Sequence, residues 1–220
     1  MLEQILNPAI YPIILQAFWK TLVMVFWSTL FSVILGFIPA VILTLTAPGG
    51  LKPNRIVYGI LSFIVNVFRS FPFIILMVIV IPFTRMIAGK AIGTTAAIVP
   101  LTISAIPFVA RVMESALRSV DPGVIEAAKA FGASDTQIIF RVAFKEAVPA
   151  ILSGITLTVI NLIGYSAMGG AIGAGGLGDV AIRYGYQRYD FGYLVVTSLV
   201  LIVFVQLVQL LGNHMYNKLS

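Results

Sequence analysis

The sequence predicts an all-α membrane protein with five transmembrane helices. Its 220 residues are 60% hydrophobic and only 10% charged, whereas an ordinary soluble domain carries roughly 25% charged residues. The charges are also clustered, and most of the uncharged runs between them approach or exceed the about 20 apolar residues that a spanning helix needs. A single transmembrane domain is therefore expected over 1–220, with spans at 18–46, 69–86, 90–111, 147–170 and 191–212.

The composition excludes several other classes of protein. The absence of cysteine rules out disulfides, thiolate catalysis, iron–sulfur clusters and cysteine-based zinc sites. The net charge of +6 does not indicate nucleic-acid binding, because no basic helix interleaves with aromatic residues. His214 stands alone and no His/Asp/Ser set is present, so we expect no metal site, cofactor site or catalytic centre in this chain.

The distribution of basic residues predicts the orientation in the membrane. Five spans place nine Lys and Arg residues on one side and five on the other, and the richer side is expected to be cytoplasmic. The amino terminus is then outside and the carboxyl terminus inside. The start of the chain lacks the basic region of a signal peptide, so the first apolar run is expected to remain as a span.

The first half of the chain contains three expected spans. Residues 1–17 form an external leader, and the first span follows and ends near Pro48, which cannot continue a helix. Residues 56–68 are apolar but stop at Arg69, so we expect a helix in the cytoplasmic interface or buried in protein, with the second span starting near Pro72. The third span carries Pro100 and Pro107, which predict kinks or protein neighbours.

Residues 112–146 form a polar cytoplasmic loop, and the segment from Arg111 to Glu146 holds 10 of the 22 charged residues. Within it, residues 121–145 read as two short helices joined by a bend, here called the elbow. Asp121 is suited to cap the first helix and Gly132 to end it in a left-handed conformation. Ser134 and Gln137 form a capping box for the second helix. The plain alternative is an amphipathic loop that rests on its own membrane domain.

The order of residues in the elbow resembles the EAA motif of ABC importer permeases, the loop that these proteins insert into a cleft of their ATPase subunits. The segment is Glu126–Ala127–Ala128, three residues, then Gly132–Ala133. Residues 68–73 look like the motif that opens a membrane helix in amino-acid permeases of this kind. Residues 97–101 and 164–178 are similar to the permease subunit of methionine ABC importers, and the match covers essentially residues 18–212. One departure is Phe144–Lys145, where the family usually has Leu-Pro.

The resemblance implies a function and a set of partners. The chain is expected to be the permease subunit of an ATP-driven importer of methionine, L- and D-forms, in a bacterial inner membrane. It would form a homodimer surrounded by lipid, with an ATPase dimer below that binds ATP and Mg, and an extracytoplasmic methionine-binding protein above. The residues expected to couple to the ATPase are Glu126, Ala127, Ala128, Phe131, Gly132 and Ala133.

Two further groups of residues are candidate sites. The Gly-rich stretch from 164 to 178 does not fit a nucleotide-binding loop; it indicates either close helix packing or a flexible wall of the transport pathway. The expected pathway residues are Tyr165, Ser166, Met168, Gly169 and Gly170. The expected docking residues for the binding protein, which would otherwise be interface anchors, are Arg183, Tyr184, Tyr186 and Arg188.

Three alternatives remain open from the sequence. An ion-coupled secondary transporter would carry ionisable residues inside its spans, and Arg69 is the candidate. A structural membrane subunit would move nothing. An ABC permease for another small amino acid or peptide would share the elbow but not the substrate.

Overall fold

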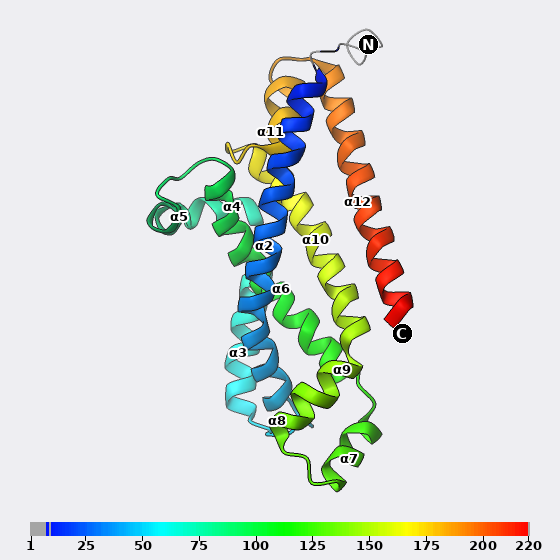
Figure 1. Cartoon of the computed structure of the whole chain (residues 1–220). Helices are drawn as coiled ribbons and strands as arrows, with labels where there is room; N and C mark the ends of the chain where they lie inside the picture. Colours follow the sequence, from blue (N-terminus) through cyan, green and yellow to red (C-terminus); the bar gives the residue numbers. More distant parts are fainter. Residues whose placement is uncertain (1–7, 9, 220) are drawn as a thin grey trace.

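The computed structural model describes residue 8 and residues 10–219, and nearly all of these residues are helical, with no strand among them. Residues 1–7 and 9 of the expected leader lie outside this part. The longest helix, α2 (Ile10–Thr46), runs along the whole bundle (Figure 1) and packs mainly on α6 (Thr94–Arg118) and also on α10 (Val148–Gly170). The last helix, α12 (Phe191–Leu219), packs on α10.

Four of these helices, α2, α6, α10 and α12, are long and apolar enough to cross a membrane. A fifth candidate is a bent pair, α3 (Arg55–Arg69) and α4 (Phe73–Ile79), whose axes differ by 101°. An all-helical architecture with four to five candidate spans is thus confirmed.

The helix α2 begins at Ile10, before the expected start of the first span at residue 18. Pro12 lies in its first turn, where the missing backbone N–H would have had no intrahelical partner. The segment 10–17, which we expected to be an external leader, is therefore helical.

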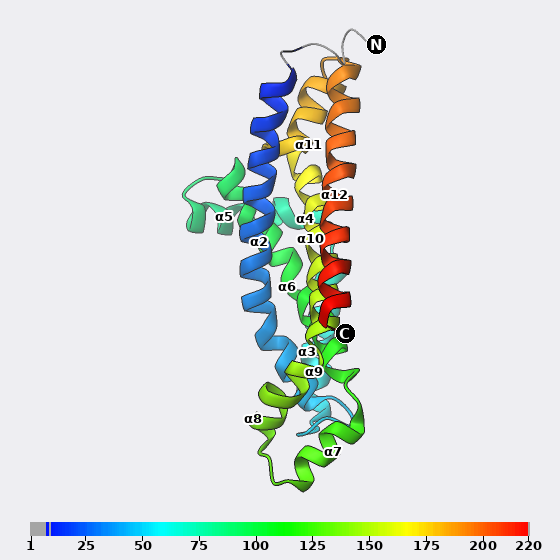
Figure 2. The same cartoon turned by 45° about the vertical axis from the view of Figure 1, so that its right-hand side comes forward.

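The second expected span, 69–86, is not one helix. It is divided between α4 and α5 (Ile81–Ala88), which project sideways from the bundle (Figures 1 and 2). The break after α3 falls at Ser70–Pro72, as the proline predicts, and Asn54 caps the start of α3 by accepting from the N–H groups of Ile56 and Val57. The helix α3 packs against α2 and α6, and the chain changes direction at the bend that follows it.

The remaining helices lie close to the expected spans. Both prolines of α6 are buried in the bundle and the helix continues through them, in line with the expectation of protein neighbours. The helix α6 runs on to Arg118, beyond the expected end at 111, and α12 runs on to Leu219, beyond 212. The short elements α7 (Pro122–Ala130), α8 (Asp135–Gln137), η1 (Ile138–Ala143) and α9 (Phe144–Glu146) form one end of the molecule.

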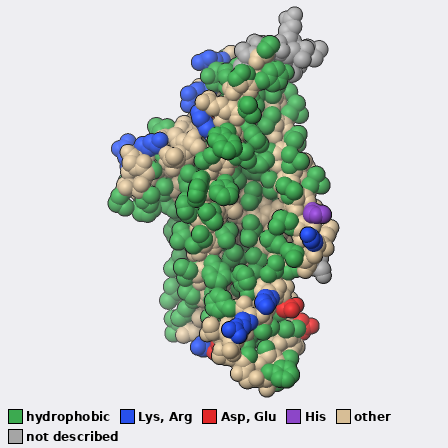
Figure 3. Space-filling view, in the orientation of Figure 1, with side chains coloured by type: hydrophobic (Ala, Val, Ile, Leu, Met, Phe, Trp, Pro, Cys, Tyr) green, Lys and Arg blue, Asp and Glu red, His purple; other side chains and the backbone are tan. Residues whose placement is uncertain are grey.

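Hydrophobic side chains cover most of the bundle surface (Figure 3). On this face, the acidic side chains lie at the end formed by α7–α9, and basic side chains gather at both ends and on the α4–α5 projection. An apolar flank between polar ends is the pattern that a bilayer requires.

Candidate functional site

The first elbow helix, α7, has the caps that the sequence predicts. An Asp121 carboxylate oxygen accepts from the Gly123 N–H at 2.6 Å, and Pro122 occupies the first helical position. At the other end Gly132 is left-handed, with φ +78°. The Gly132 N–H donates to the Lys129 carbonyl and the Ala133 N–H to the Ala128 carbonyl, which is the paired bonding of a Schellman turn. Two backbone hydrogen bonds therefore fix the geometry of the bend.

The second elbow helix also begins as predicted. The Ser134 hydroxyl accepts from the Gln137 N–H, and the Gln137 side chain accepts from the Ser134 N–H at 2.9 Å. Ile138 and Ile139 are buried, whereas Arg141 is exposed. This helix is thus anchored on the chain by its apolar face.

The departure at Phe144–Lys145 leaves the second elbow helix almost continuous with α10. Phe144 packs edge-on against Phe37 of α2 at 5.6 Å between ring centroids. Helical structure stops only at Ala147, before α10 starts at Val148 with Pro149 in its first turn. The elbow is therefore joined to α10 by a one-residue break.

The first elbow helix, in contrast, contacts η1 and packs Ile125 against the core but is otherwise largely exposed. No residue of α7 is buried, and the Phe131 side chain that follows it is 91% exposed. A hollow of about 280 Å³ lies behind α7, lined by residues that include Ile125, Glu126, Lys129 and Ile138. An exposed aromatic side chain on a capped, rigid helix is typical of a contact surface for another protein.

The expected coupling residues share this exposed position. Glu126, Ala127, Phe131 and Gly132 are exposed, and Ala128 and Ala133 are partly buried. The plain alternative, a loop resting on its own membrane domain, describes the second elbow helix better than the first, of which Ile125 packs on the core. The exposed ion pair between Lys52 and Asp135, 3.5 Å long, links the base of the elbow to the loop after α2.

The Gly-rich stretch breaks the helix as expected. α10 ends at Gly170, and the chain turns through three glycines with positive φ, Gly173, Gly175 and Gly176, into α11 (Gly176–Val180). A Cβ on Gly170 would lie 2.2 Å from the Asp179 nitrogen, and one on Gly178 would lie 2.2 Å from the Ala167 carbonyl oxygen. The backbones of α10 and α11 therefore cross in direct contact, which supports the close-packing interpretation for these two glycines.

Some of the expected pathway residues are buried by this packing, and others are exposed. Tyr165 stacks on Phe73 of α4 at 4.7 Å, and the buried Ser166 hydroxyl donates to the Ile163 carbonyl. Gly169 and Gly170 are buried, whereas the Met168 side chain is 47% exposed. Met168 is thus the exposed member of this group.

The expected docking residues lie at the other end of the bundle, in η2 (Ala181–Tyr186) and the loop after it. Arg183 pairs with Asp179 at 2.8 Å, and the Arg188 guanidinium lies over the Tyr184 ring at 4.6 Å. Tyr186 is 71% exposed. Arg183 and Arg188 thus fix the conformation of this segment, and the Tyr186 side chain is exposed on its surface.

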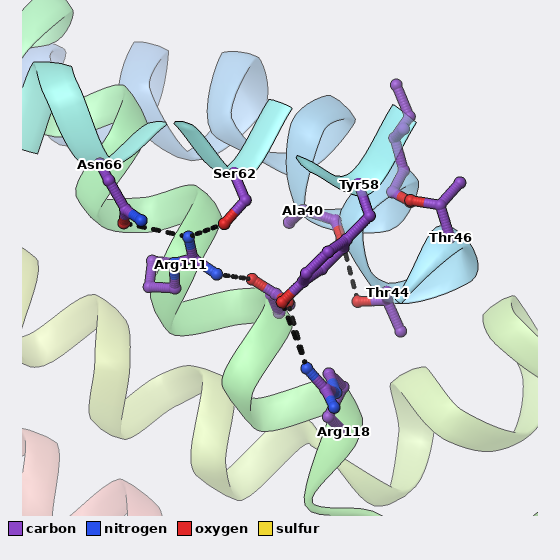
Figure 4. A network of polar contacts seen from close by, with 10 residues as sticks. Ala40, Thr44, Thr46, Tyr58, Ser62, Asn66, Arg111 and Arg118 are labelled. Carbon is purple, nitrogen blue, oxygen red and sulfur yellow. Dashed lines mark hydrogen bonds and ion pairs between the residues drawn. The ribbon is translucent and has the colours of Figure 1, made fainter. Parts of the chain in front are cut away.

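Sequence reasoning missed a polar network between α3 and α6, centred on Arg111 (Figure 4). Its guanidinium donates to Glu114 at 2.6 Å, to the Ser62 hydroxyl at 2.8 Å and to the Asn66 side-chain oxygen at 3.1 Å. The polar positions 58, 62 and 66 recur every four residues in an otherwise apolar run. That spacing is a signal of one helical face, and it could have been read from the sequence.

Glu114 is the acidic partner in this network and its side chain is only 3% exposed. The Tyr58 hydroxyl donates to it at 3.1 Å, and Arg118 approaches it at 3.5 Å. A buried carboxylate with two arginines and a tyrosine has its charge and its lone pairs satisfied. The network therefore holds α3 against α6 next to the elbow.

Comparisons with known proteins agree with this geometry. The family model described as "Binding-protein-dependent transport system inner membrane component" matches residues 32–220. The probable D-methionine transport system permease protein MetI of Vibrio cholerae is 49% identical over 208 residues, which cover 94% of this chain and 92% of that protein. The methionine import system permease protein MetP of Bacillus subtilis is 44% identical over 176 residues, 80% of this chain and 79% of that protein.

Solved structures show the same fold. An inward-facing structure of the MetNI methionine ABC transporter matches with a TM-score of 0.95 and 43% identity, covering 98% of this chain and 100% of that one. An amino acid ABC transporter crystallised with histidines matches with a TM-score of 0.78 and 21% identity, covering 94% of each chain. The prediction of a transport permease rather than an enzyme is confirmed, and the chain, a multi-pass protein of the bacterial inner membrane, belongs to the family of binding-protein-dependent transport system inner membrane components.

Proposed function

We propose that this chain is the permease subunit of an ATP-driven importer that moves methionine, in both its L- and D-forms, into the cytoplasm. The proposal is supported by relatives named for methionine or D-methionine transport that align with most of the chain. The observation that carries it is the elbow, whose first helix has no fully buried residue and is followed by a Phe131 side chain that is 91% exposed.

The first elbow helix is the proposed contact with a separate ATPase subunit. Phe131 offers an apolar anchor, the small residues Ala127 and Ala128 permit close approach, and Gly132 fixes the bend. Closure of two ATPase subunits around ATP and Mg would push this rigid helix, and the push would reach the membrane helices through the second elbow helix and α10.

The complete transporter would contain two copies of this chain around a central passage, two ATPase subunits at the elbow end and a methionine-binding protein at the η2 end. In this orientation the amino terminus is outside, and the elbow and carboxyl terminus are cytoplasmic. The excess of Lys and Arg on the elbow side supports the orientation, and the exposed Tyr186 supports docking at the opposite end.

The proposed pathway wall is the Gly-rich stretch, with Met168 as the side chain that occludes the passage. Its 47% exposure and its place beside the turn at Gly170 support this role, and an unbranched thioether adapts easily to an irregular opening. Tyr165, Ser166, Gly169 and Gly170 position Met168 through their packing.

A proton- or sodium-coupled mechanism needs an ionisable group that can change its charge within the spans. Glu114 is such a group by position, but two arginines and a tyrosine engage it and its side chain is 3% exposed. An ATP-driven mechanism with an external ATPase fits this arrangement better.

The test replaces Gly132 by valine in the reconstituted transporter. Because Gly132 has φ +78° and a Cβ at this position would meet no atom within 4 Å, the change strains the bend without a clash inside the chain. We expect methionine uptake to fall at least tenfold while the ATPase subunits still hydrolyse ATP, measured in parallel on the same proteoliposomes.

The matched control is Gly89→Val, because Gly89 has φ +70° and an equally open surrounding but lies at the end of α5. This variant should transport almost as well as the unmodified protein. Equal uptake by Gly132→Val and Gly89→Val would contradict the assignment of the elbow.

A further inference from the structure

The elbow end of α6 carries a polar stripe beside α3, whose own outer face is apolar, with Ile60 and Phe63 exposed. Asn66 of α3 and Ser115 and Arg118 of α6 are exposed there, next to the buried network of Arg111 and Glu114. By contrast, α12 has no charged residue from 191 to 213, and large apolar side chains cover its outer face. Ionisable residues near a bilayer face protein or water rather than lipid, so this surface of α6 is not a lipid-facing one.

This stripe surrounds a hollow of about 410 Å³ over the last turns of α6, lined by Arg111, Glu114, Ser115, Arg118 and Ser119. Two guanidinium groups and one carboxylate give the hollow an excess of one positive charge. A carboxylate or phosphate is the chemical group that such a surface favours.

The two arginines differ in how strongly the chain engages them. Arg111 makes three hydrogen bonds of 2.6–3.1 Å and its side chain is 23% exposed. Arg118 makes only contacts at 3.5 Å, to Tyr58 and Glu114, and its side chain is 43% exposed. Contacts of that length are weak, so the donors of Arg118 remain available to a ligand in the hollow.

We propose that this hollow is a carboxylate subsite on the cytoplasmic part of the passage, where Arg118 binds the α-carboxylate of the amino acid before its release. Arg111, Glu114 and Tyr58 are positioning residues: they hold the end of α6 against α3 and set the local charge. This subsite rests on the proposed function, since it needs an amino acid in the passage.

The carboxylate of Glu114 also explains why such a site would release its ligand. Without it, two arginines would bind an anion tightly, whereas a single excess charge gives a weak site. Transport requires a binding step that is favourable but easily reversed.

Phosphate on an anionic lipid shares this chemistry, and the experiment separates the two sources. The complex of this chain with its ATPase partner is placed in nanodiscs of phosphatidylcholine, without binding protein or nucleotide. Binding of L-methionine and of L-methioninamide, which has no carboxylate, is measured by saturation-transfer NMR. The variants are Arg118→Gln and, as the control, Arg55→Gln at the exposed start of α3.

We expect Arg118→Gln to weaken methionine binding about tenfold, the usual effect of losing a charge-assisted hydrogen bond. Arg55→Gln should bind methionine as the unmodified complex does, and methioninamide should bind weakly and equally to all three. Phosphatidylglycerol in the nanodiscs should leave methionine binding unchanged.

Three outcomes would overturn the subsite: methionine binding that is undetectable in the unmodified complex, that is unchanged in Arg118→Gln, or that is displaced by phosphatidylglycerol. Uptake by the unmodified transporter with its binding protein is recorded separately in proteoliposomes. If that uptake is present, such a result rejects the subsite alone, and if uptake is missing, the proposed function itself fails.

Discussion

Glu114 shows how a buried charge is held between two helices of an apolar bundle. Moving an isolated carboxylate out of water costs several kcal/mol, and the cost is recovered only with close partners of opposite charge. Arg111 at 2.6 Å and Tyr58 at 3.1 Å are such partners. The sequence places Glu114 and Arg111 at the edge of a span, but their partners on α3 lie about 50 residues away in the chain and follow only from the tertiary structure.

The change Glu114→Gln removes the charge and leaves Arg111 without its ion pair. We expect the free energy of unfolding to fall by about 3 kcal/mol, the lower end of the range for breaking a buried pair, because Arg111 is partly exposed. Thermal unfolding of the purified protein in detergent measures the change.

Asp135→Asn is the matched control, since it breaks the exposed pair with Lys52 and should cost less than about 1 kcal/mol. Similar losses for the two variants would show that the network does not stabilise the contact between α3 and α6.

At the scale of single elements, the sequence correctly predicted helix caps and breaks. It did not predict the direction in which the chain continues after a break. The Asp121 cap, the Ser134 capping box and the left-handed Gly132 were all predicted, because each depends on residues only a few positions apart. Pro72 correctly indicated the break after α3, but the 101° bend depends on how α3 packs against α2 and α6, which no local signal encodes.

The crossing of α10 and α11 is an element-scale feature with a sharp test in Gly178→Ala. Its Cβ would lie 2.2 Å from the Ala167 carbonyl oxygen, and backbone on both sides cannot move aside as a side chain can. We expect a loss of at least about 3 kcal/mol in stability, the upper part of the range for overpacking, measured by thermal unfolding together with the yield of folded protein.

Gly164→Ala serves as the comparison, because a Cβ there meets no atom within 4 Å and alanine favours the helix. It should keep or slightly raise the stability. Full stability of Gly178→Ala would mean that the two backbones do not cross as closely as the structure shows.

On the scale of the whole molecule, the bundle has two unlike flanks. The end of α6 presents polar groups, whereas α12, like the outer face of α3, presents apolar ones. Composition and hydropathy predicted an all-helical protein with about five spans, but they average over each helix. The placement of the polar flank depends on which helices are neighbours.

The two flanks should differ in their access to water. In a chain without cysteine, Ser115→Cys on the polar flank should react with a charged, membrane-impermeant thiol reagent in inside-out vesicles and not in right-side-out vesicles. Val203→Cys on α12, where the side chain is 56% exposed, should react in neither, because it faces lipid. Labelling is measured by mass spectrometry, and reaction of Val203→Cys alone would reverse the assignment of the flanks.

The helix α10 begins directly after the one-residue break at Ala147 and connects the elbow with the opposite part of the molecule. Its 23 residues span about 35 Å, from the base of the elbow to the crossing at Gly170. The proline of this helix lies beside the break, so a tilt imposed at the elbow would swing the far tip as a stiff rod does, with little lost to bending along the way. The elbow and the crossing at Gly170 would then move together, because they lie at the two ends of one helix.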